Sequence, residues 1–112
     1  MSFTGLIFSP DGRRLFLANV NGSVKVFDVG TNGHVTGAFS IALPDANAPR
    51  RTNEIPAGLA LSRDGRRLYV ALNLSNRLGE FDATTGKLLR LFDVGVAPFD
   101  VVLVGDRAYV SN

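Results

Sequence analysis

The sequence predicts an all-β protein built from repeated four-stranded antiparallel sheets. The first observation is an internal repeat: GLIFSPDGRRLFLA at residues 5–18 returns as GLALSRDGRRLYVA at residues 58–71, with nine of fourteen positions identical. Each copy is an apolar run, a turn containing Asp-Gly-Arg-Arg and a second apolar run, which is the pattern of a β-hairpin. No stretch of ten residues keeps the i, i+3, i+4, i+7 apolar spacing of a helix.

The first repeat contains four expected strands. The apolar run Phe3–Phe8 ends at a Ser-Pro-Asp-Gly turn, and Arg14–Val20 follows as a strand that is apolar on both sides and needs cover on both faces. Asn21-Gly22 is the strongest hairpin signal in the chain, and it leads into the alternating strand Ser23–Phe27. Val35–Ile41 is a fourth, more polar strand.

A second set of four strands follows with the same landmarks. Phe27-Asp28 returns as Phe81-Asp82, and Gly33 returns as Gly86. The second set is expected at Ala57–Leu61, Arg67–Asn73, Arg77–Phe81 and Lys87–Val94. A third set then begins, with strands expected at Phe99–Leu103 and Arg107–Ser111.

A set of four short strands that recurs along the chain is the sequence sign of a β-propeller, in which each four-stranded sheet is one blade. The predicted fold is a partial β-propeller within residues 1–112, with two four-stranded antiparallel blades and the first two strands of a third. The expected segments are a first blade at about 3–42, an inserted loop at 43–56, a second blade at about 57–95 and a half blade at 98–112.

The repeated segments resemble the blades of YVTN-repeat propellers. The resemblance rests on SPDGRRLFLAN, SRDGRRLYVAL and DRAYVSN, on the turns FDVGTNG and FDATTGK, and on the final Tyr-Val-Ser-Asn, which is one residue from the motif that names the family. It covers essentially the whole chain. The departures are Leu72 before Asn73, and Glu80 where the first repeat has the apolar Val26.

The resemblance implies a bacterial-type protein with a seven-bladed propeller and a periplasmic or extracellular location, although no signal peptide is recognised at the N-terminus. The expected function is a non-enzymatic binding or scaffold module. The expected partners are the remaining blades, or other copies that meet through exposed blade faces. The alternatives are the propeller of a hydrolase, lactonase-like or joined to a phosphoesterase domain, and a cell-surface structural protein of the surface-layer type.

The amino-acid composition limits which binding partners and which kinds of chemical site are expected. The chain is 46% hydrophobic and 20% charged, as expected of a folded globular protein, and its net charge of +2 is spread along the sequence. Interspersed charge without stacking aromatics gives no reason to expect nucleic acid. No apolar run is long enough for a membrane-spanning helix, so membrane insertion is not expected. The absence of cysteine excludes disulfides, thiol nucleophiles and cysteine-based metal sites.

No catalytic residue, metal site or cofactor is expected in this segment. His34 is the only histidine, and one histidine cannot form a multi-histidine metal site, or a catalytic triad without positioned partners. The aspartates at the turns are explained by turn chemistry, because Asp bonds nearby backbone and Gly adopts left-handed conformations. The expected structural turn residues are Asp11, Gly12, Asp64, Gly65, Asp28 and Asp82, with positive φ at Gly12 and Gly65.

The repeat does not explain the segment Leu43–Pro56, LPDANAPRRTNEIP, since the next blade junction is only Gly95–Pro98. In a propeller this junction shares a face with the turns between second and third strands, and inserted loops on a rigid scaffold often carry function. We therefore expect a polar small molecule or a partner's loop to bind there. The candidate binding residues are Asp45, Arg50, Arg51, Asn53, Glu54, Asn73 and Asn76. The alternatives are a tolerated surface insertion, or binding on the opposite face at a basic arc of Arg13, Arg14, Arg66, Arg67 and Arg107.

Overall fold

Three antiparallel β-sheets organise residues 5–112, which are the residues that this computed structural model describes. The first sheet contains β1 (Leu6–Phe8), β2 (Arg14–Asn19), β3 (Ser23–Val29) and β4 (Val35–Ala42). The second contains β5 (Pro56–Leu61), β6 (Arg67–Leu72), β7 (Arg77–Asp82) and β8 (Leu88–Asp93). The third pairs β9 (Asp100–Val104) with β10 (Arg107–Ser111).

Consecutive strands are neighbours in every sheet. The predicted all-β fold, with two four-stranded antiparallel units and the first two strands of a third, is therefore confirmed. The start of the first predicted strand, Phe3 and Thr4, lies outside the described residues, and β1 begins at Leu6.

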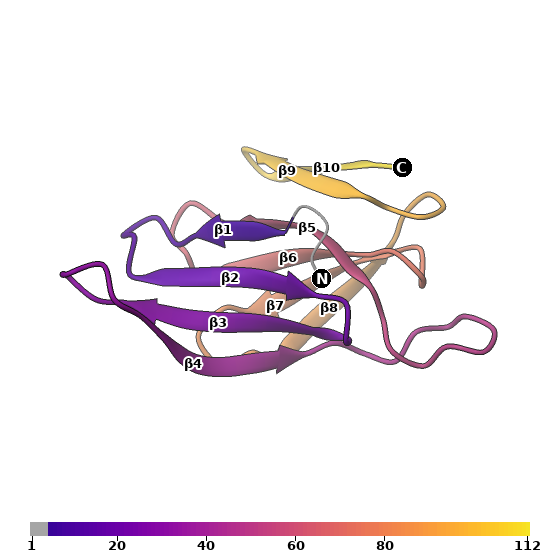
Figure 1. Cartoon of the computed structure of the whole chain (residues 1–112). Coiled ribbons are helices and arrows are strands. Elements are labelled where there is room, and N and C mark those ends of the chain that lie inside the picture. The colour runs from indigo at the N-terminus through magenta and orange to yellow at the C-terminus, as the bar shows by residue number, and fades with distance from the viewer. Residues whose placement is uncertain (1–4) are drawn as a thin grey trace.

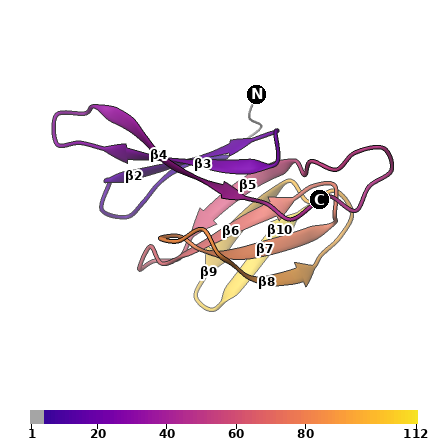
Figure 2. The ribbon, with the colours of Figure 1, turned by 90° about the horizontal axis from the view of Figure 1, so that it is seen from below.

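The three sheets follow one another in space, and their first strands lie closest together (Figure 1, Figure 2). β5 contacts both β1 and β9, while β2 also contacts β5 and β6 also contacts β9. The outer strands β4 and β8 lie away from this meeting line (Figure 1). Sheets that converge on their first strands in this way have the arrangement of successive propeller blades.

The main hydrophobic core lies between the first and second sheets. Alternation along the strands directs Phe16 of β2 and Val26 of β3 into this core, each about 1% exposed. Leu68 of β6 and Phe81 of β7 enter it from the second sheet, and both are fully buried. Each of these two sheets therefore buries one of its faces against the other, and this contact between sheets removes apolar side chains of both from water.

The β1–β2 turn is closed by a serine and an aspartate. Ser9 Oγ donates to Asp11 Oδ1 at 2.6 Å, and the same oxygen accepts the Arg13 N–H at 2.9 Å. These two bonds, the serine bond first, hold the pKa of Asp11 below its ordinary value of 3.8. The β5–β6 turn repeats the bonds at 2.7 and 3.0 Å with Ser62, Asp64 and Arg66. Gly12 and Gly65 both have φ of 73°, which confirms the predicted left-handed glycines.

Replacing Gly65 with Val should lower the free energy of unfolding by about 1 kcal/mol or more, because a β-branched residue is strained at positive φ. A Cβ at this position would also lie 3.3 Å from Pro10 Cδ of the first sheet. Gly12→Val is the matched control, since its φ is also 73° but the space around it is open. Urea denaturation should show a loss for both variants and the larger loss for Gly65→Val. An unchanged midpoint for either variant would contradict this description of the turns.

The two Phe-Asp pairs lead into different turns. Asp82 Oδ1 accepts two successive backbone N–H groups of the following turn at 2.8 and 2.9 Å, which is the Asx-type turn that the sequence predicts. Asp28 instead lies within β3, with its Oδ1 3.5 Å from Arg14 Nε. The turn after β3 is closed by Asn32, whose Oδ1 accepts a backbone N–H at 3.1 Å. The Asx turn predicted at Asp28 is therefore not formed, because the strand continues past this residue.

Candidate functional site

A buried carboxylate holds the loop of residues 43–55 against the second sheet. Glu54 is only 1% exposed. Its Oε2 accepts the Ser75 hydroxyl at 2.5 Å, and its Oε1 accepts the N–H groups of Leu74 and Ile55 at 2.7 and 2.9 Å. Both oxygens are thus occupied in fixing the loop to the β6–β7 turn, and Glu54 anchors the loop instead of presenting an acceptor at its surface.

A second anchor joins the loop to the β2–β3 turn. Arg51 Nη2 donates to the Val20 carbonyl at 3.2 Å, and its Nε donates to the Asn53 carbonyl at 3.0 Å. Gly22 of the same turn lies against Asn53. The loop and the two turns therefore share one end of the molecule, where the loop extends beyond the ends of the strands (Figure 1).

The two asparagines proposed for binding fasten the β8–β9 junction. Asn73 Nδ2 donates to the Pro98 carbonyl at 3.1 Å. Asn76 Oδ1 accepts the Ala97 N–H at 2.9 Å, and its own backbone has φ of 56°. These bonds tie the second sheet to the chain that enters the third sheet.

The structure brings all seven predicted residues to one end of the molecule, but most of them serve as anchors. Asp45, Arg50 and Asn53 are the exceptions, since they are exposed and no side-chain hydrogen bond within residues 5–112 holds them. Arg50 has φ of 62°, an uncommon conformation for a residue with a side chain. Ligand binding at this end remains a prediction.

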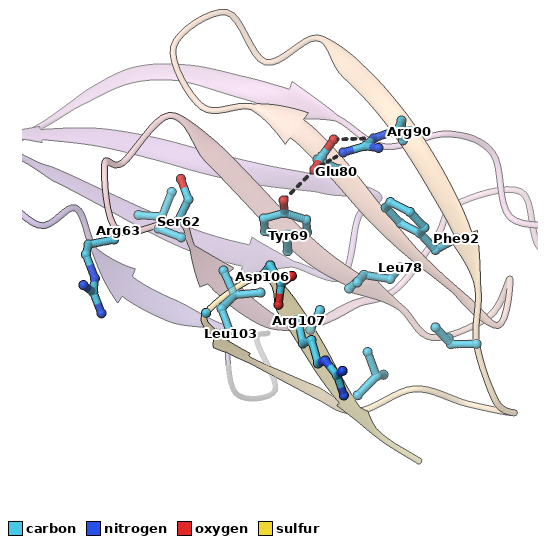
Figure 3. A pocket seen from close by; sticks show the side chains of 15 residues that line it. Ser62, Arg63, Tyr69, Leu78, Glu80, Arg90, Phe92, Leu103, Asp106 and Arg107 are labelled. Carbon is cyan, nitrogen blue, oxygen red and sulfur yellow. Dashed lines mark hydrogen bonds and ion pairs between the residues drawn. The ribbon is translucent and has the colours of Figure 1, made fainter.

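A cavity of about 960 Å³ lies between the second sheet and the β9–β10 hairpin (Figure 3). Tyr69, Glu80 and Arg90 line one wall, and Leu103 and Ala108 line the other. Of the residues that the sequence suggests for binding, only Arg107 of the alternative basic arc lines this cavity. The cavity forms only when two separate sheets face each other, so a local sequence pattern does not indicate it.

Three side chains form a hydrogen-bonded row on the wall of this cavity (Figure 3). Tyr69, Glu80 and Arg90 are directly opposite one another on β6, β7 and β8. The Tyr69 hydroxyl donates to Glu80 Oε2 at 2.5 Å, while Arg90 Nε and Nη2 donate to Glu80 Oε1 and Oε2 at 2.8 and 3.2 Å. The Glu80 side chain is 4% exposed and that of Arg90 is 66% exposed, so a buried carboxylate is paired with a cation that still reaches solvent.

The equivalent row of the first sheet is apolar. There Phe16, Val26 and Phe39 are opposite one another and pack against the second sheet. Glu80 stands at the repeat position of Val26, and a charged residue at an apolar repeat position is the sequence signal that marks this row. The signal showed that the position is unusual, but not that Tyr69 and Arg90 would complete a network with it.

The electrostatics of the row follow from its hydrogen bonds. The bond from Arg90 is the main cause that holds the pKa of Glu80 below its ordinary value of 4.5, with burial opposing it and the Tyr69 hydroxyl adding to it. Burial first, and then the bond to Glu80, raise the pKa of Tyr69. The row is therefore a carboxylate kept ionised by two donors.

Acid should weaken the second sheet through Glu80. A carboxylate with a lowered folded pKa contributes its full stability above its unfolded pKa, near 4.5, and loses it as pH falls through the folded pKa. The native protein should have a larger free energy of unfolding than Glu80→Gln at about pH 6, and this difference should shrink as the pH falls to about 3. Asp93→Asn is the control, because the Asp93 side chain is 94% exposed and should give a much smaller change. A pH-independent difference for Glu80→Gln, measured by urea unfolding, would contradict this account.

Other candidate chemistry is sparse in the part of the chain that the structure describes. Residues 5–112 contain no group of three or more His, Cys, Asp or Glu placed to hold a metal ion. His34 is exposed in the turn between β3 and β4. Within the same residues no helix has the length and apolar character needed to cross a membrane.

No family model and no curated protein matches this chain. Solved structures do match it. Hydrazine synthase from Kuenenia stuttgartiensis is 26% identical with a TM-score of 0.76, over 98% of this chain and 29% of that one. A protein from Bacteroides uniformis with a proposed 6-phosphogluconolactonase activity is 25% identical with a TM-score of 0.69, over 88% and 29% of the two chains. The β-propeller domain of Cps50 (Swd1) from Myceliophteria thermophila is 22% identical with a TM-score of 0.65, over 89% and 28%.

The chain has the fold of part of a β-propeller. It spans about a third of the length of the chains that it matches. Those chains include proteins with different activities, so the fold by itself does not specify what this one does.

Proposed function

We propose that this chain is two and a half blades of a larger, YVTN-type propeller of seven blades, which acts as a non-enzymatic binding scaffold. In this proposal the blades are residues 3–42, 57–95 and 98–112, with residues 43–56 inserted between the first two. The share of the matched chains that this one spans supports the proposal.

Open apolar faces at both ends of the stack of sheets carry the proposal. On the outer side of the first sheet, Leu6 and Phe8 are 56% and 59% exposed. On the outer side of the third, Val102, Val104 and Tyr109 are 56% to 59% exposed. These residues alternate with others that face the neighbouring sheet, so each end presents a face of the kind that the next blade covers in a repeat protein.

The state of the 112-residue chain in solution tests this proposal. We expect association that increases with concentration in analytical ultracentrifugation, together with binding of an apolar dye. A variant with Phe8 and Val104 changed to Ser should reduce both, because it makes each end face more polar. A monodisperse monomer that unfolds cooperatively and binds no dye would contradict the proposal.

We place the binding function at the loop end. The support is that Glu54 and Arg51 fix the loop at two separate turns, so that its exposed Asp45 and Arg50 project from a rigid base. An exposed carboxylate and guanidinium suit a polar small molecule or a polar loop of a partner protein.

The binding proposal is tested in the longer protein with a panel of sugars, nucleotides and amino acids scored by thermal shift. A shift should be lost when residues 43–56 are shortened to a four-residue connection, as between β8 and β9. It should survive the change of Arg13, Arg14, Arg66 and Arg67 to Ser, which alters the opposite end. A thermal shift that survives the shortened loop but is lost with the arginines would place binding on the basic arc. If no compound in the panel shifts the melting temperature, a small-molecule ligand is rejected.

An enzymatic role is the second candidate, and the likeness to the Bacteroides uniformis protein favours it. The described residues contain no metal cluster, and their one histidine is exposed in a turn, so residues outside this chain would have to supply the chemistry. Hydrolysis of 6-phosphogluconolactone by the longer protein, above the spontaneous rate, would support this candidate. A rate equal to the spontaneous one would reject the enzymatic candidate and leave the scaffold proposal in place.

A further inference from the structure

The loop of residues 43–55 carries a tight turn at its tip. Ala48 and Arg51 form an isolated antiparallel bridge, so that Pro49 and Arg50 are the central residues of the turn. Arg50 has φ of 62°. Proline at the first central position and positive φ at the second are typical of a type II turn. In both views the loop projects beyond the ends of the strands (Figure 1, Figure 2).

The tip contains one of the three Arg-Arg pairs of the chain. The other two pairs, Arg13-Arg14 and Arg66-Arg67, lie where β2 and β6 begin. The first carbonyl of each of these pairs is held by a neighbouring strand or turn, since it accepts the N–H of Val29 at 2.8 Å or of Ala83 at 3.0 Å. Arg50 is exposed, and no hydrogen bond among residues 5–112 engages its N–H, its carbonyl or its guanidinium. Only the pair at the tip is therefore held by neither sheet ladder nor hairpin turn.

These differences decide which peptide bond a protease can reach. Exposed loop tips are the preferred sites of proteolytic nicking, because the bond can enter the cleft of the enzyme without unfolding a sheet. A trypsin-class serine protease also needs an arginine side chain for its acidic specificity pocket. The Arg50 guanidinium is available for this pocket. That of Arg51 is held by the carbonyls of Val20 and Asn53 at 3.2 and 3.0 Å, so the bond after Arg51 is the poorer substrate.

We propose that the peptide bond between Arg50 and Arg51 is a processing site for trypsin-class proteases, and that the nicked protein stays folded as two associated fragments. One water is consumed when the C–N bond breaks. Its oxygen becomes part of the new carboxylate of Arg50, and its two protons go to the new α-ammonium group of Arg51. The inference rests on the structure of the loop and not on what the loop binds.

The contacts that join the two fragments all survive this cut. Arg51 still donates to the Val20 carbonyl, so the new N-terminus stays attached to the first sheet. Glu54 still holds the same segment to the β6–β7 turn. The core between the first and second sheets, with Phe16 on one side and Phe81 on the other, is made by residues of both fragments. The cut therefore releases the tip and leaves the packing between the sheets in place.

Limited digestion with trypsin, followed by mass spectrometry, tests the site. The first products should be residues 1–50 and 51–112. Arg50→Gln should slow the first cut in the loop at least about tenfold, because a neutral side chain leaves the carboxylate of the enzyme's pocket unpaired. Arg66→Gln is the matched control, since Arg66 is an exposed arginine of the other kind of pair, and it should leave the rate unchanged. Arg51→Gln should leave the cut after Arg50.

Urea below the unfolding transition separates a cut in the native protein from one that needs opening of a sheet. The rate after Arg50, normalised to that of a short arginine peptide, should change less than about twofold between no urea and about 1 M urea. The rates after Arg14 and Arg67 should increase about fivefold or more, because those residues are in strands. On size exclusion the nicked protein should elute with the intact chain, and a denaturing gel should separate its two fragments.

Four results would overturn the inference. They are a first cut after any other arginine or lysine, an unchanged rate for Arg50→Gln, separate elution of the two fragments, and inhibition of trypsin by the intact chain without cleavage. The last result would make the loop a protease inhibitor instead of a substrate. None of them bears on the association and dye binding that test the larger-propeller proposal, or on the panel that tests ligand binding.

Discussion

Phe81→Ala should lower the free energy of unfolding by about 3 to 5 kcal/mol. Phe81 is fully buried between the first and second sheets, where it belongs to the core that includes Leu68 and Val26. Removing its ring leaves a void that two packed sheets cannot close without moving apart, so the cost combines lost burial with a cavity. Urea unfolding followed by circular dichroism measures the change.

Phe27→Ala is the matched control for this prediction. Phe27 holds the same repeat position and the same place in its strand, opposite Leu15 as Phe81 is opposite Leu68. It is only partly buried, because no sheet among residues 5–112 packs against that side of the first sheet. We expect a loss less than half as large as that for Phe81→Ala. Equal losses would show that packing within a sheet, and not between sheets, dominates stability.

Gly58→Ala should separate the third sheet from the second. The Gly58 N–H donates to the Phe99 carbonyl at 2.7 Å, so the two backbones are in direct contact where β5 meets β9. A Cβ on Gly58 would lie 2.5 Å from Asp100 Cα and 3.0 Å from the Val101 nitrogen, and would also overlap the Asp100 carboxylate. Backbone atoms cannot move aside as a flexible side chain does, so we expect a loss of about 1 to 3 kcal/mol.

Hydrogen exchange locates this effect. Amides of β9 and β10 should exchange at least about tenfold faster in Gly58→Ala, while amides of β6 and β7 change little, because local opening needs only the hairpin to detach. Gly37→Ala is the control, since Gly37 lies in β4 and a Cβ there would meet nothing within 4 Å. Uniformly faster exchange across all three sheets would show that Gly58 supports the whole molecule and not the attachment of the hairpin.

The strands and the hairpin turns were predictable because their determinants are local. Ser9, Asp11 and Gly12 lie within four residues of one another, and their bonds form whatever the rest of the chain does. The internal repeat then placed the second sheet from the first. The role of Asp28 was not predictable in this way, because the length of β3 depends on its pairing with β2 and β4.

The candidate site depended on contacts between distant parts of the chain. Composition identified the 43–56 segment as an unusual loop, and propeller topology placed it beside the right turns. That Glu54 is buried, however, follows from its bonds to Leu74 and Ser75, about twenty residues away. Sequence pattern could not separate an anchoring carboxylate from an exposed one, because both are polar residues in a polar loop.

The sequence by itself therefore determined the all-β class, the repeat, the strand order and the geometry of the turns, since each rests on interactions between near neighbours or on copies of the same segment. Only the tertiary structure decided which face of each sheet is buried, that Glu80 is held by Tyr69 and Arg90, and that a cavity adjoins the free edge of β10. The physical reason is that burial and the low dielectric that accompanies it arise when separate sheets meet, and no local pattern records which residues of two sheets will face each other.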